Sequence, residues 1–320
     1  MFAKLFKYDM KSISKAGIPT LICVAGLSVL GFLASLLFVL GATHTHLIRE
    51  AYANAHLADN VTLANVLELL HFSAVMATIA MIIAVFGIST LLKAFPVVIT
   101  VITVVNFYKT LITDEGYLTF TLPVHPVKIL TSKLLNSVVW NYIVSIATTI
   151  ASFVILAPMP LLLLKYEWLK VPFTEMIPSM LKGFEWYDIV GGITNILLSA
   201  VLSFLVVVTT QLLYFLAVFL GGVVAKKQKL VAGGGFIVAG HLLFEIVKGI
   251  IAFGVMVATM TLAILSSFIT EVILENWEIV IPISFIPVTT SLLQIGAFLL
   301  LGGGLFAITS WLMTKKLNLP

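Results

Sequence analysis

Residues 71–106 read HFSAVMATIAMIIAVFGISTLLKAFPVVITVITVVN, an apolar run that contains one lysine, Lys93, and one proline, Pro96. About 20 apolar residues are enough to cross the hydrocarbon core of a bilayer as a helix. The run is therefore long enough for one extended span or for two short ones. The choice decides the fold, because a division at Lys93 and Pro96 would reverse the orientation of everything downstream.

The composition of the whole chain indicates a membrane protein. The chain is 61% hydrophobic and 10% charged, with a mean hydropathy of +1.16, whereas a soluble globular chain carries roughly 25% charged residues. Backbone polar groups find no partners in lipid, and continuous apolar runs favour helices over a barrel. We predict an all-α integral membrane protein, a single transmembrane domain over residues 1–320, with six spans at about 18–40, 71–106, 134–164, 190–225, 230–270 and 283–313.

The basic residues support one long second span. With a cytoplasmic N-terminus and six spans, twelve lysines fall in the cytoplasm: Lys4, Lys7, Lys11, Lys15, Lys109, Lys128, Lys133, Lys226, Lys227, Lys229, Lys315 and Lys316. Only four basic residues fall outside: Arg49, Lys165, Lys170 and Lys182. This bias is the positive-inside rule. We therefore predict one kinked helix over 71–106, tilted or projecting from the bilayer, and both termini in the cytoplasm.

The N-terminus, MFAKLFKYDMKSISK, places the lysines at 4, 7, 11 and 15 on one helical face. This pattern predicts an interfacial helix on the inner leaflet; the alternative is a plain charged tail that sets orientation. The apolar run that follows, Ile18 to Leu40, is longer than the 7–15 residues of a secretory signal. We expect it to be retained as the first span.

Several kinds of chemistry are absent from the sequence. It holds no G-x-x-x-x-G-K-[ST], H-E-x-x-H or G-x-S-x-G motif, so we expect no enzyme activity and no cofactor in this chain. The run Gly233 to Gly235 is read as a tightly packed or flexible helix start. The single Cys23 excludes an intrachain disulfide. An outer loop over about 41–70 holds His44, His46 and His56, which we read as solvated histidines rather than a metal site. Nucleic acid is not an expected partner.

Residues 107–133, FYKTLITDEGYLTFTLPVHPVKILTSK, interrupt the apolar pattern between the second and third spans. Charge places them in the cytoplasm. Gly116 suits the end of one helix and Pro126 the first turn of the next. The apolar residues between them either pack on the bilayer interface or form a docking element for a soluble partner. Physical reasoning alone leaves these two readings open.

A resemblance favours docking. The string DEGYLTFTLPV, followed by Pro126 and by Ser132-Lys133, resembles the cytoplasmic segment of permease subunits of type-2 ABC transporters, which are mostly bacterial exporters. The start Phe6-Lys7-Tyr8-Asp9-Met10-Lys11 and the six-span layout are also similar. The chain departs from the family at His125, where a serine that could cap the next helix is common.

The resemblance implies a coupling helix that seats in a separate ATPase subunit, which would hold ATP and Mg. It assigns ATPase coupling to Asp114, Glu115, Gly116, Tyr117, Leu118, Phe120, Leu122 and Pro123. It also implies a pair of permease subunits, identical or not, in the cell membrane, moving an amphipathic peptide, drug or lipid. The rival classes are an ion-gradient-driven transporter or channel and a non-transporting immunity or scaffold protein.

Polar residues inside the spans mark a candidate substrate path or gate. His241, Glu245 and Lys248 share one face of the fifth span. They either line such a path or, in the case of Glu245 and Lys248, simply pair with each other. Asn195 and Gln211 are read as amides that join helices more than as residues that line the path. Lys93 either extends its ammonium group to the membrane surface or lines the path. The acidic segment 271–281 is either re-entrant or an outer loop.

Overall fold

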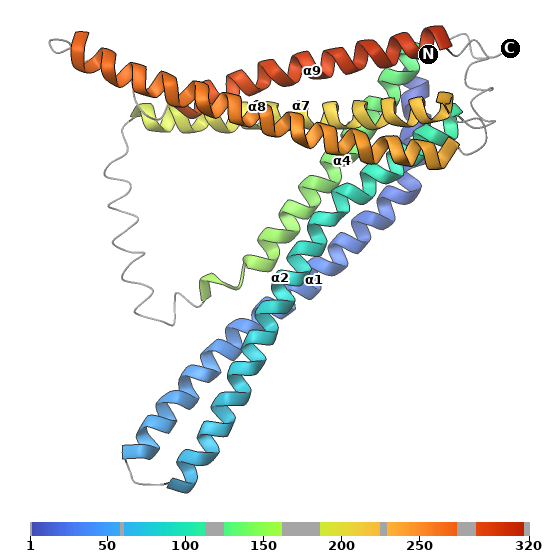
Figure 1. Cartoon of the computed structure of the whole chain (residues 1–320). Helices are drawn as coiled ribbons and strands as arrows, with labels where there is room; N and C mark the ends of the chain where they lie inside the picture. The colour runs from blue at the N-terminus through green and yellow to red at the C-terminus, as the bar shows by residue number, and fades with distance from the viewer. Residues whose placement is uncertain are drawn as a thin grey trace. The chain divides into compact units, whose positions relative to one another are not determined.

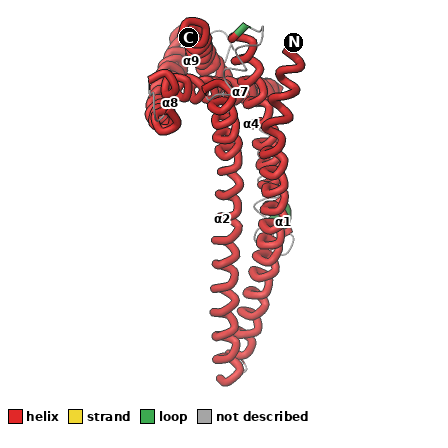
Figure 2. Tube along the Cα trace, turned by 90° about the vertical axis from the view of Figure 1, so that its right-hand side faces the viewer, coloured by secondary structure: helices red, strands yellow, loops and turns green. Residues whose placement is uncertain are grey.

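The computed structural model describes residues 2–57, 61–112, 125–161, 186–224, 229–273 and 286–316. Within these ranges the regular elements are all helices (Figure 2). They are α1 (Phe2–Leu57), α2 (Val61–Ile112), α4 (Pro126–Leu156), α7 (Trp186–Val224), α8 (Lys229–Ile273) and α9 (Ile286–Lys316). Six helices of the described part are long and apolar enough to cross a membrane, which confirms the predicted all-α class with six candidate spans.

The stretch 71–106 lies within one helix. α2 runs from Val61 to Ile112 with Pro96 inside it, so the prediction of a single long helix is confirmed. At 1.5 Å per residue its 52 residues extend over about 78 Å. The hydrocarbon core is only ~30 Å thick, and much of this helix must therefore lie outside that core.

Of two predictions about helix ends, one is wrong and the other is not confirmed. The expected outer loop at 41–70 is helical wherever it is described, because α1 continues to Leu57 and α2 begins at Val61. A separate interfacial helix is not seen, because α1 runs unbroken from Phe2 into the first span. Hydropathy locates the part of a helix that crosses lipid, but residues such as Ala, Leu and Glu continue the helix beyond it.

The chain divides into two compact units. The first unit comprises Met1–Ile13, Thr100–Val139 and Gly183–Pro320, and in it α7, α8 and α9 lie side by side (Figure 1). Its core joins the C-terminal part of α2 and the N-terminal part of α4 to α7 and α9. The buried members are Val104, Phe107, Leu111, Ile129, Leu130, Phe215, Val218, Phe219 and Met313.

A close helix contact and a stacked aromatic pair hold the first unit together. Phe107 of α2 stacks on Phe215 of α7, with ring centroids 4.1 Å apart and planes 4° from parallel. Gly221 of α7 faces Gly233 of α8 so closely that a Cβ on Gly221 would collide with the Gly233 backbone. The predicted tight packing at the Gly233–Gly235 run is therefore confirmed for Gly233.

The second unit comprises Ser14–Ile99 and Trp140–Lys182, and its described part contains segments of α1, α2 and α4. Val24, Val85, Leu92, Ala151 and Ile155 form its buried core. Many outward side chains are also apolar; Phe86 and Phe153 expose 76% and 70% of their surface. Helices that are apolar on their outer faces are suited to lipid contact.

Candidate functional site

The predicted ATPase-coupling residues lie outside the described part of the chain. These are Asp114, Glu115, Gly116, Tyr117, Leu118, Phe120, Leu122 and Pro123. The structure does describe both flanks, since α2 extends to Ile112 and α4 begins at Pro126. The candidate site therefore comprises the helix ends that carry this segment.

His125 caps the start of α4. Its Nδ1 accepts a hydrogen bond from the backbone N–H of Val127 at 3.4 Å, and its carbonyl oxygen accepts one from Lys128 at 2.9 Å. The first N–H groups of a helix have no partner within the helix, so these two bonds satisfy exposed donors. A histidine thus fills the capping position, and Pro126 occupies the first helical position as predicted.

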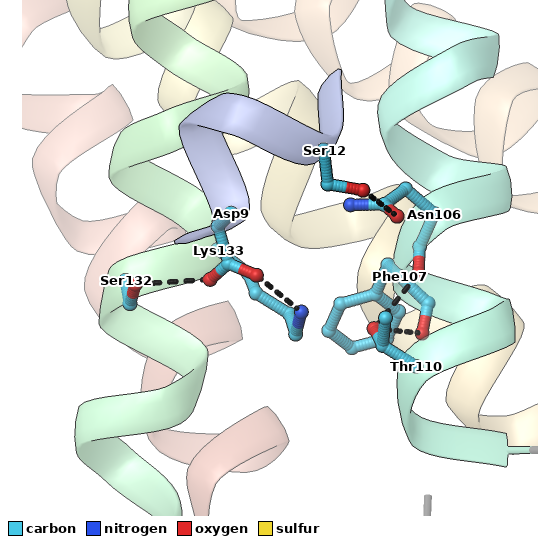
Figure 3. A network of polar contacts seen from close by, with 7 residues as sticks. All are labelled: Asp9, Ser12, Asn106, Phe107, Thr110, Ser132 and Lys133. Atoms are coloured by element: carbon cyan, nitrogen blue, oxygen red, sulfur yellow. Dashed lines mark hydrogen bonds and ion pairs between the residues drawn. The ribbon is translucent and has the colours of Figure 1, made fainter. Parts of the chain in front are cut away.

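A buried ion pair joins α1 to α4. The Lys133 Nζ lies 3.0 Å from Asp9 Oδ1, and the Ser132 hydroxyl donates to Asp9 Oδ2 at 3.1 Å (Figure 3). Only 6% of the Lys133 side chain and 11% of the Asp9 side chain are exposed. Both carboxylate oxygens are occupied, as a buried charge requires.

The N-terminal part of α1 also reaches α2. Ser12 donates a hydrogen bond to the Asn106 side-chain oxygen at 3.3 Å (Figure 3), and Leu5 packs against the core of the first unit. The first turns of α1 thus connect the two helices that flank the coupling segment.

This Asp9 connection was missed in the sequence. Asp9 is separated from Lys133 by 124 positions, and helical periodicity carries no information on such a distant pair. A signal was nevertheless present, because the two strings that carry the family resemblance contain Asp9 and Ser132-Lys133 respectively. The structure brings these two strings into direct contact.

Asn136 lies one turn further along α4 and is fully buried. Neither its Nδ2 nor its Oδ1 atom has a hydrogen-bond partner among the described residues. A buried amide without partners destabilises a fold by about 1–3 kcal/mol. Asn136 is therefore a candidate weak point beside the Asp9–Lys133 pair.

The predicted polar cluster on α8 is brought together. Glu245 Oε1 lies 2.6 Å from Lys248 Nζ and 4.0 Å from His241 Nε2. The second His241 nitrogen, Nδ1, lies 3.0 Å from the hydroxyl of Tyr214 on α7. Tyr214 was not among the predicted residues, because its contact comes from helix packing rather than from spacing along α8.

The surroundings of this cluster are half open. The His241 and Glu245 side chains are each 47% exposed, and Lys248 is 32% exposed. Lys248 Nζ also lies 5.4 Å above the Phe244 ring, which meets Phe298 of α9 edge to face. Such a row of linked polar groups can pass a proton or contact a polar ligand. Glu245 and Lys248 therefore pair with each other, which was one of the two readings of this cluster.

The other polar residues of the spans divide into two kinds. Gln211 donates to Thr100 at 3.3 Å and thereby joins α7 to α2, while Ser291 donates to Asn195 at 3.0 Å and joins α9 to α7. Both amides therefore connect helices, as expected. Lys93 instead lines a cavity along α4.

The histidines of the expected loop at 41–70, and His71 just after it, lie on helices. His46 faces Glu50 at 3.5 Å on α1, and His71 lines a cavity of about 250 Å³ with Arg49, Tyr52 and Glu68. His44 and His56 are also within the α1 range. The segment 271–281 lies outside the described residues beyond Ile273.

These features define a multi-pass, all-helical membrane protein with a tightly joined helix junction and a half-open polar row. No family model, curated protein or solved structure matches the chain. Its function is therefore inferred from its own residues and from the sequence resemblance.

Proposed function

We propose that the chain is the membrane permease subunit of an ATP-driven ABC exporter. It moves an amphipathic peptide, drug or lipid, and a separate ATPase subunit binds ATP and Mg and drives the movement. Residues 114–123 form the coupling helix that seats in that ATPase. A second permease copy or paralogue completes the transporter in the cell membrane, with both termini in the cytoplasm.

The observation that carries this proposal is the junction at the two flanks of the coupling segment. The buried Asp9–Lys133 pair joins α1 to α4, and the shared apolar core joins α2 to α4, α7 and α9. A push on residues 114–123 would therefore act on helices that are packed together. Rigid-body movement of packed helices is a common way to switch between access states.

Co-purification with the ATPase tests this proposal. An ATPase encoded beside this chain should co-purify with the unchanged permease and give ATP-dependent transport. Tyr117→Ala and Gly116→Pro should remove both properties. Tyr8→Ala is the matched control, because Tyr8 is 72% exposed and outside the coupling segment. Retention of ATPase and of ATP-dependent transport by both coupling variants would refute the proposal.

The polar row on α7 and α8 favours one alternative, a transporter driven by an ion gradient. Tyr214, His241, Glu245 and Lys248 form a connected series of groups that can exchange protons. In that case transport would proceed without an ATPase and would depend on pH, and Glu245→Gln would remove the pH dependence. ATP-dependent transport that Glu245→Gln leaves equally sensitive to pH would exclude this alternative.

A further inference from the structure

Lys93 is a charged residue within the membrane-crossing part of α2. The candidate span Asn65–Ile112 contains it, and within the described residues no ion pair or hydrogen bond involves its ammonium group. An ionisable side chain inside a span is costly and usually marks a functional site. The residues around the Lys93 side chain therefore indicate which ligand would suit it.

The Lys93 side chain borders a cavity of about 300 Å³ that belongs to the second unit. The rest of the lining comes from one face of α4: Thr148, Thr149, Ser152, Phe153 and Leu156. Thr148 is buried, whereas Phe153 and Leu156 expose 70% and 52% of their surface. The cavity is therefore a groove that opens on the outer surface of the helices.

The hydroxyl groups of the groove are already engaged as donors. Thr148 and Thr149 donate to the Ser145 carbonyl oxygen at 2.9 and 2.8 Å, and Ser152 donates to that of Thr148 at 2.9 Å. Their hydrogens are thus bound within α4. Among the polar side chains that line the groove, Lys93 is therefore the one whose hydrogens can be donated to a ligand. Its positive charge favours an anionic ligand.

The groove opens on helices α2 and α4, which are both long and apolar enough to cross a membrane. Its exposed apolar residues, Phe153 and Leu156, are therefore suited to contact with a lipid acyl chain. A lysine within such a span extends its ammonium group toward the polar head groups of the bilayer. A lipid can thus supply both an apolar chain for the groove and a polar group for Lys93.

We propose that this groove binds an anionic phospholipid from the surrounding bilayer. The phosphate lies against Lys93, and an acyl chain lies along Phe153 and Leu156. A zwitterionic phospholipid carries its own cation beside the phosphate, which Lys93 would repel. This site goes beyond the proposed transport function and needs no ATPase, so it is tested on the isolated chain.

Native mass spectrometry of the purified chain in detergent tests the site. Phosphatidylglycerol and phosphatidylcholine with identical acyl chains are titrated separately. Phosphatidylglycerol should bind more tightly, and Lys93→Gln should weaken its binding about tenfold, the effect of losing one charge-assisted hydrogen bond. Lys93→Arg should keep the preference. Lys128→Gln is the matched control, because this exposed lysine at the start of α4 carries the same charge.

A second variant tests the groove itself. Ser152→Phe fills the cavity and should weaken phosphatidylglycerol binding while the thermal unfolding temperature stays within a few degrees of the parent. The proposal fails if Lys93→Gln and Lys128→Gln weaken binding equally, or if neither weakens it. It also fails if phosphatidylcholine binds as tightly as phosphatidylglycerol, or if oleate binds and phosphatidylglycerol does not.

Discussion

Two lysine–carboxylate pairs in the first unit have the same charges and opposite surroundings. In the Lys133–Asp9 pair the side chains are 6% and 11% exposed, and in the Lys248–Glu245 pair they are 32% and 47% exposed. The first pair joins helices that are distant in sequence, whereas the second links two positions of one helix. The buried pair is therefore suited to fixing the helix junction, and the half-open pair is free to act on a ligand or proton.

Removing one partner of the buried pair should have the largest effect. Asp9→Ala leaves the Lys133 ammonium buried without its carboxylate, so the free energy of unfolding should fall by about 3–5 kcal/mol. SDS titration of the protein in mixed micelles measures this loss.

A double variant tests whether the stability loss comes from leaving one charge buried without its partner. Asp9→Leu combined with Lys133→Met removes both charges and should recover most of the stability, because apolar replacement of a whole buried pair is often neutral. Full stability of Asp9→Ala alone would show that the pair does not support the junction.

A glycine at a close helix contact and a glycine on an open helix face should respond differently to an added methyl group. Gly221→Ala forces a Cβ against the backbone of Gly233, so α7 and α8 must separate, at a cost of about 1–3 kcal/mol. Gly249→Ala, on the open part of α8, meets no atom within 4 Å and should gain up to about 1 kcal/mol of helix propensity. Equal unfolding free energies for the two variants would contradict this difference in packing.

The half-open pair should matter little for stability. Glu245→Gln should lower the free energy of unfolding by at most about 1 kcal/mol, because accessible ion pairs contribute little. The same SDS titration measures it beside Asp9→Ala. A loss as large as that of Asp9→Ala would show that the Glu245–Lys248 pair has a structural role.

The smallest effect is expected at Asn136. Its buried amide has no partner among the described residues, so its removal by Asn136→Leu should gain about 1–3 kcal/mol. The different shape of the leucine in a packed site should offset most of that gain, and the net change in unfolding free energy should be no more than about 1 kcal/mol. A large loss in the titration would show that the Asn136 amide makes hydrogen bonds that stabilise the junction.

The sequence was sufficient for the helices and insufficient for their contacts. Apolar runs and lysine positions predicted six spans and the undivided α2, because both depend on local composition. The Asp9–Lys133 and Tyr214–His241 contacts depend on how distant helices pack, which no local period reports. The helical ends at 41–57 and 61–70 were also missed, since hydropathy marks the lipid-crossing part of a helix and not its full length.

Site-directed crosslinking tests the central claim most directly, that residues 114–123 contact an ATPase subunit. Cys23 is the one cysteine of the chain, so Cys23→Ser supplies a background without thiols. A benzophenone maleimide attached through Thr119→Cys should crosslink to the co-expressed ATPase on illumination, because Thr119 lies within 114–123 but is not one of the assigned coupling residues. The same reagent attached through His44→Cys should not crosslink. No adduct from Thr119→Cys, or equal adducts from both positions, would contradict the account.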